Sequence, residues 1–156
     1  MKRSFLLHFR LEILWWLITL AVAAVILWPI RVNVPGFPFF RMNLAFILIF
    51  ITLTRYIFLL QYTFLSHIWW LKVVLVFCCI PGVFLMIQEI TFLQTFLDER
   101  GPEALVGAMP PARMQQWLTY IRTEYLLFGV GSVIAAIILP FRLVISVWRK
   151  WNLGRE

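Results

Sequence analysis

Four long apolar stretches, separated by short polar segments, constrain this chain more than any other feature of its sequence. The first covers residues 11–30, and no charged residue lies between Ile13 and Trp28. Three more follow at residues 42–62, 69–90 and 125–147. A helix of about twenty apolar residues crosses the hydrocarbon core of a bilayer. The sequence therefore predicts an all-α integral membrane protein whose four transmembrane helices form a single domain, residues 1–156.

Composition supports this class and excludes others. Hydrophobic residues make up 63% of the chain and charged residues 13%, whereas a soluble domain has about 45–50% and about 25%. A soluble chain of 156 residues could not bury so much apolar surface. The formal net charge is +7, but the basic residues flank the apolar stretches instead of forming one run. This placement is typical of topology signals and lipid-headgroup contacts, so we predict no nucleic-acid partner.

The first apolar stretch has a competing interpretation as a cleavable signal peptide, because residues 21–23 offer small side chains at a possible cleavage site. The apolar run continues beyond them through Leu27, and Trp15 and Trp16 suit a permanent anchor. We therefore predict that this stretch stays in the protein as the first span.

The distribution of Lys and Arg predicts the orientation, since cytoplasmic segments near span ends carry more of them. Four spans place both termini on one side. If that side is the cytoplasm, the inner segments hold the larger set: Lys2, Arg3, Arg10, Lys72, Arg142, Arg149, Lys150 and Arg155. The outer segments hold Arg31, Arg41, Arg100, Arg113 and Arg122. We predict cytoplasmic termini, and the short loops suggest a bacterial inner membrane.

The longest polar region, residues 91–124, is predicted to be an outer loop. The third helix should continue through Leu97 and stop at residues 98–102, where Gly101 and Pro102 break it. After Pro111, apolar residues recur at helical spacing at Met114, Trp117, Leu118, Ile121 and Tyr125. This pattern predicts a short amphipathic helix on the membrane surface that leads into the last span.

Three ionisable residues lie within or near the predicted spans. Arg55 lies in the inner half of the second span, where it could snorkel to the headgroups, pair with Glu12 of the first span, or take part in transport. Glu89 lies at the outer end of the third span, either in contact with water or facing Arg31, Arg41 or a partner subunit.

Two further features concern helix shape and packing. Pro81 and Gly82 fall in the middle of the third span and predict a kink. The last span carries a face of small residues, which lets helix backbones approach closely in lipid. This face is a candidate docking surface for another helix, of this chain or of a partner: Gly129, Gly131, Ser132, Ala135 and Ala136.

No motif predicts chemistry. The adjacent Cys78 and Cys79 do not have the spacing of a metal or redox motif. We predict no catalytic residue, no cofactor and no metal site. A lipid-acting enzyme that uses Asp98, Glu99 and Glu103 is a weaker interpretation, because these residues fit a solvated helix end.

These observations favour a non-enzymatic accessory or scaffolding subunit of a larger membrane complex. Its expected partners are the lipid bilayer and other membrane subunits, or further copies of itself. The alternative is an oligomeric transporter or channel for ions or small solutes. It would use Arg55, Glu12 and the Pro81–Gly82 kink, with Asn43, Thr52 or Thr54 as further polar groups.

Overall fold

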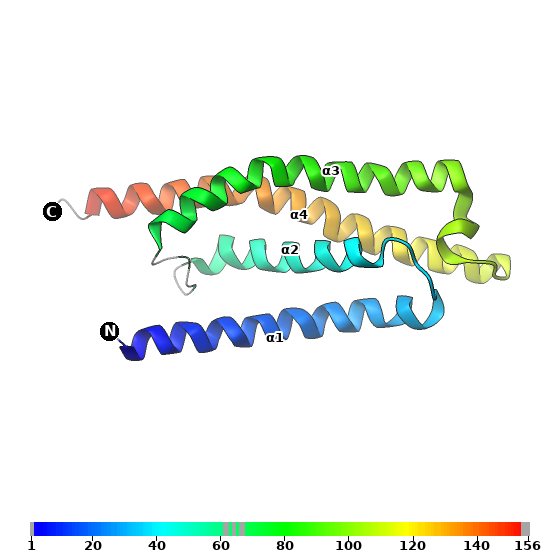
Figure 1. The fold of residues 1–156 in the computed structure, drawn as a ribbon, viewed down its shortest axis with the longest axis horizontal. Helices are drawn as coiled ribbons and strands as arrows, with labels where there is room; N and C mark the ends of the chain where they lie inside the picture. The colour runs from blue at the N-terminus through cyan, green and yellow to red at the C-terminus, as the bar shows by residue number, and fades with distance from the viewer. Residues whose placement is uncertain (1, 61–62, 64, 66–67, 154–156) are drawn as a thin grey trace.

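The computed structural model describes residues 2–60, 63, 65 and 68–153, and within them the chain forms four helices and no strand. These helices are α1 (Lys2–Asn33), α2 (Phe40–Leu59), α3 (Trp69–Val106) and α4 (Pro111–Leu153). Each is long and apolar enough to cross a membrane. They run alternately up and down, so both ends of the chain lie at the same end of the bundle (Figure 1). The predicted all-α class with four transmembrane helices is confirmed. The predicted end of the second span at residue 62 lies outside the described residues.

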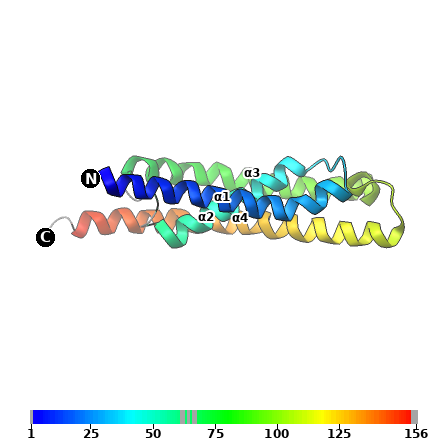
Figure 2. The same cartoon turned by 90° about the horizontal axis from the view of Figure 1, so that it is seen from below.

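Helix α4 is the centre of the bundle. It packs against both α2 and α3, whereas α1 packs chiefly against α2 (Figures 1 and 2). The most buried residues of α4 recur every three or four positions, which is the period of one helix face. They are Ile121, Tyr125, Gly129, Ser132, Ala136, Leu139 and Leu143. This single face meets two neighbouring helices, and between Leu127 and Trp148 the exposed residues of α4 are large and apolar, as expected of a helix in contact with lipid.

The α1–α2 connection forms part of the core at one end of the bundle. Gly36 adopts a φ of 95°, which allows the chain to turn between the two helices. The turn directs Phe37 and Phe39 inward, and both are buried. The ring of Phe39 contacts those of Phe96 and Tyr125 with centroid distances of 5.2 and 6.1 Å. Edge-on aromatic contacts of this kind fix the ends of α1 and α2 against α3 and α4.

The prediction of a separate short amphipathic helix is wrong. Helix α4 begins at Pro111 and continues without a break to Leu153, so the amphipathic stretch is simply its first turns. No glycine or proline between Ala112 and Phe128 interrupts the helix. Its apolar stripe packs on the protein core instead of lying on the membrane, since Ile121 and Tyr125 are fully buried. Most of the predicted outer loop is therefore helical, and α3 and α4 are joined by residues 107–110.

The interior break of α3 lies at Gly101, where φ is 76° and ψ is 171°. This is the position at which the sequence predicts that the helix stops. The residues after it form one further helical stretch, closed by the Gly107 N–H, which donates to the Glu103 carbonyl at 2.8 Å. Pro81 and Gly82 lie within α3, where the backbone keeps helical dihedral angles. The kink there stays a prediction.

Arg142 of α4 satisfies one of the last carbonyls of α2. Its Nε donates to the Ile57 carbonyl at 3.2 Å, and the last four carbonyls of a helix have no partner within that helix. We expect Arg142→Leu to lower the free energy of unfolding by about 1–2 kcal/mol, because a charge-assisted bond is lost. Denaturant titration in micelles measures this change. Arg149→Leu, at an exposed position of the same helix, should have little effect, and equal losses would contradict the assignment.

Candidate functional site

An ion pair joins α1 to α2 within the spans. The Arg55 guanidinium Nη2 contacts the Glu12 Oε1, and only 5% of the Arg55 side chain is exposed. The Tyr56 hydroxyl donates to the same Glu12 oxygen at 3.4 Å. The guanidinium carbon also lies 5.0 Å from the centroid of the Tyr56 ring and 6.0 Å from that of Trp15. The charge of Arg55 is thus held by one carboxylate and two aromatic faces.

This arrangement bears on the alternatives left open for Arg55. A snorkelling arginine keeps its charged end at the headgroups, whereas here the charged end is enclosed between α1 and α2. Lone charges are costly within a bilayer, and those found there pair with one another. The Glu12–Arg55 contact therefore acts as the polar link that holds α1 on α2. A role of either residue in transport stays a prediction.

A second buried polar contact joins α2 to α4 near the opposite end of the bundle. The Asn43 side-chain N–H donates to the Glu124 Oε2 at 2.5 Å. Asn43 is fully buried and Glu124 is 7% exposed. The other oxygen of each side chain, Asn43 Oδ1 and Glu124 Oε1, is also buried and has no hydrogen-bond partner among the described residues. Two unsatisfied acceptors in one contact are unusual, because buried polar groups are nearly always hydrogen-bonded.

Glu124 is a residue that sequence reasoning missed. We placed it in the outer segment, residues 91–124, at the end of a helix expected to lie on the membrane surface, so a buried contact with Asn43 was not predicted. One signal could have found it, since Glu124 lies roughly two helical turns before Gly131 of the small-residue face. A helix that continued upstream from that face would therefore place Glu124 on its buried side.

The small-residue face of α4 packs within this chain. A Cβ placed on Gly131 would lie 2.7 Å from Cε2 of Phe50 of α2, and one on Gly129 would lie 3.1 Å from Cδ1 of Ile90 of α3. Ser132 is fully buried, and its hydroxyl donates to the Phe46 carbonyl of α2 at 3.0 Å. Ala135 and Ala136 are also buried. The helix that docks on most of this surface is therefore α2, with α3 beside it.

Helices α2 and α3 both pack on α4 but have few contacts with each other. An apolar groove of about 320 Å³ lies between them. Ala45 of α2, Gly82 of α3 and Ala136 of α4 line it, so small residues from three helices converge there. Its larger side chains are Met42, Phe46, Ile49, Leu53, Leu75, Leu85 and Met86, together with Cys78 and Cys79. Nothing lies within 4 Å of a Cβ placed on Gly82.

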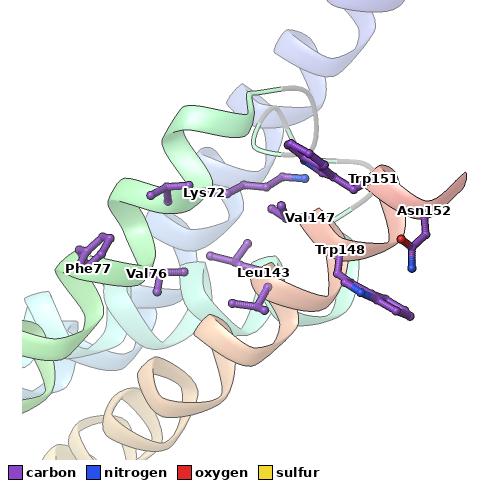
Figure 3. A pocket seen from close by; sticks show the side chains of 10 residues that line it. Lys72, Val76, Phe77, Leu143, Val147, Trp148, Trp151 and Asn152 are labelled. Carbon is purple, nitrogen blue, oxygen red and sulfur yellow. The ribbon is translucent and has the colours of Figure 1, made fainter. Parts of the chain in front are cut away.

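Another groove, of about 510 Å³, lies between the start of α3 and the end of α4 (Figure 3). Lys72 extends from α3 across the groove, and its ammonium donates to the Ser146 hydroxyl at 3.1 Å. Leu143 and Val147 line the groove, and Trp148 lies at its exposed side. The apolar stem of Lys72 thus covers the α3–α4 contact while its charge is bonded at the end of the bundle.

Other candidate residues have simpler surroundings. Glu89 is half-buried, and its main-chain carbonyl accepts a hydrogen bond from the Tyr125 hydroxyl at 3.4 Å. The expected contacts of its carboxylate stay predictions. In the part of the chain that the structure describes, no three His, Cys, Asp or Glu side chains gather as metal ligands. Cys78 and Cys79 are both free thiols.

Comparisons with known proteins give no relative for this arrangement. No protein family, no curated protein and no solved structure matches the chain. The geometry of the helices and their contacts therefore carries the functional argument.

Proposed function

We propose that this protein is a non-enzymatic subunit of a larger membrane complex, and that the groove between α2 and α3 receives a transmembrane helix of another chain. The observation that carries the proposal is the convergence of Ala45, Gly82 and Ala136 on that groove. In lipid, helices associate where small residues let their backbones approach and pack closely. A groove with small residues on three sides is suited to a further helix.

Gly82 adds a separate argument. A glycine inside a helix costs about 1 kcal/mol relative to alanine, and a close approach by another backbone is a common reason for one. Close packing within this chain explains Gly129 and Gly131, because side chains of α2 and α3 lie so close to them that a Cβ would not fit freely. Nothing in the described chain lies against Gly82. A partner helix in the groove would supply the missing neighbour.

The polar contacts support a non-enzymatic role. Arg55 is engaged with Glu12, Glu124 with Asn43, and Lys72 with Ser146. Each contact joins two different helices. Polar side chains that bond across helices in a bilayer stabilise helix association, as a scaffold requires. Catalytic groups, in contrast, are directed at a space where a substrate can bind. We extend the proposal to both termini lying in the cytoplasm, on the distribution of Lys and Arg, and to a bacterial inner membrane, on the short loops.

Photo-cross-linking from adjacent positions tests the proposal. Leu85 lines the groove and is 61% exposed, whereas the neighbouring Phe84 is 66% exposed and does not line it. We expect a photoreactive phenylalanine derivative at position 85 to cross-link to a protein in native membranes, and the same group at position 84 to give lipid adducts only. Equal protein adducts from both positions, or lipid adducts alone from position 85, would contradict a helix in the groove.

The transport alternative depends on Arg55 and Glu12, which are ionisable residues buried between spans. Such residues mark transport pathways in many membrane proteins. We place this alternative second because the two groups bond each other. The double variant Glu12→Leu with Arg55→Leu distinguishes the roles. A scaffold should keep its partners when both residues are replaced, whereas a transporter that uses the pair should lose flux in reconstituted vesicles.

A further inference from the structure

The contact between Asn43 and Glu124 leaves two hydrogen-bond acceptors unsatisfied. The amide of Asn43 donates to one carboxyl oxygen of Glu124. The remaining oxygens, Asn43 Oδ1 and Glu124 Oε1, are buried without a partner. Both residues are more than nine-tenths buried. An ionised carboxylate has no proton to donate, so in that state neither oxygen could satisfy the other.

No cation compensates Glu124 in the described part of the chain, where the ion pair that forms is Arg55–Glu12. The titratable groups that interact with Glu124 are Tyr120 and Tyr125 of α4, and the Tyr125 hydroxyl donates to the main-chain carbonyl of Glu89 of α3. None of these groups is basic. The basic residues toward this end of the bundle all have exposed side chains: Arg31, Arg41, Arg100, Arg113 and Arg122. A buried carboxylate without a cation is far more costly than a neutral acid.

We propose that Glu124 is a proton-binding site, and that the bound proton joins Glu124 and Asn43 as a carboxylic acid–carboxamide pair with two hydrogen bonds. The proton comes from a hydronium ion of the solvent, whose O–H bond breaks to leave water, and it forms one O–H bond at Glu124 Oε1. This hydroxyl then donates to Asn43 Oδ1, while the Asn43 amide continues to donate to Glu124 Oε2. A single proton thereby satisfies both orphaned oxygens and removes the buried charge. No other bond changes.

The consequence is that helix packing and proton binding are coupled. Glu124 lies on α4 and Asn43 on α2, so loss of the proton would leave an uncompensated negative charge between these two helices. Ser132, further along α4, bonds the Phe46 carbonyl of the same neighbour. The neutral pair therefore completes the contact between α2 and α4, and the two helices should stay closed only while the proton is bound.

Infrared spectroscopy of the full chain in lipid nanodiscs at neutral pH tests the protonation state directly. We expect the carbonyl stretch of a neutral carboxylic acid, with the small shift on deuteration that marks an exchangeable proton. The band should be absent from Glu124→Gln and unchanged in Glu89→Gln, which alters a half-buried carboxylate on α3. A wild-type protein without the band, or a Glu124→Gln variant that retains it, would overturn the proposal.

Thermal unfolding of variants supplies an independent test. The side-chain amide of glutamine presents one acceptor and one donor to Asn43, as a protonated glutamic acid does. Glu124→Gln should therefore unfold within a few degrees of the wild type, whereas Glu124→Leu should unfold well below it, because Asn43 loses both partners. If Glu124→Gln is destabilised as much as Glu124→Leu, the paired neutral acid is excluded.

Discussion

Replacing Glu12 by leucine is expected to lower the free energy of unfolding by about 3–5 kcal/mol, the cost of removing one partner of a buried ion pair. The variant leaves the Arg55 guanidinium enclosed between α1 and α2 with no carboxylate. The aromatic rings of Trp15 and Tyr56 remain beside it, but they do not neutralise its charge. Steric-trap or denaturant unfolding in bicelles measures the loss.

The matched control is the double variant Glu12→Leu with Arg55→Leu. It removes the charge together with its partner, and replacing a whole buried pair by apolar residues is often neutral or stabilising. We therefore expect most of the stability to return, with a large coupling energy between the two positions. If the single and double variants lose equal stability, the loss does not come from an uncompensated Arg55 charge, and the interpretation of the contact as a buried ion pair is wrong.

Gly131→Leu is the second substitution expected to have a large effect. Even a Cβ at this position would lie 2.7 Å from the ring of Phe50, and that ring packs edge-on against Phe128 with a centroid distance of 5.7 Å. A whole leucine side chain must displace the Phe50 ring from this packing or push α2 away from α4. Overpacking of a tight contact costs about 1–3 kcal/mol and sometimes more. The same unfolding measurement on the purified chain detects the loss.

Gly82→Leu is the control for that substitution, because it introduces the same side chain at a helix-interior glycine. Nothing lies within 4 Å of a Cβ at Gly82, so the purified chain should keep its stability or gain slightly from the better helix former. Equal destabilisation by the two substitutions would mean that a leucine is costly at either glycine, and that the contact with Phe50 does not decide the outcome.

The sequence was sufficient to predict the four spans because the bilayer fixes their length and apolar character. It was less informative about where each helix ends. The first turns of α4 carry Arg113, Gln115, Gln116 and Arg122, whose polarity led us to predict a separate helix on the membrane surface. These turns instead belong to α4, because Trp117, Ile121 and Tyr125 on the other face pack on the core. The polarity of single residues does not show which face of a helix packs on the rest of the protein.

The candidate sites also differ in whether the sequence could predict them. Glu12 and Arg55 could be considered as a pair because both fall toward the inner end of adjacent spans, and equal depth is readable from a sequence. The contact of Glu124 with Asn43 could not be foreseen while the helix around Glu124 was expected to lie on the membrane surface. The groove beside Gly82 was also hidden, because it exists only where α2 and α3 flank α4 with few contacts between them.

Native mass spectrometry after gentle detergent extraction from the host tests the central claim most directly. We predict that the 18.5 kDa chain leaves the membrane bound to at least one different membrane protein. That partner should be lost from Gly82→Phe, which fills the groove, and kept by Ile80→Phe, which enlarges an exposed position of α3 outside it. A monomer or a complex of identical chains, or a partner retained equally by both variants, would contradict the account.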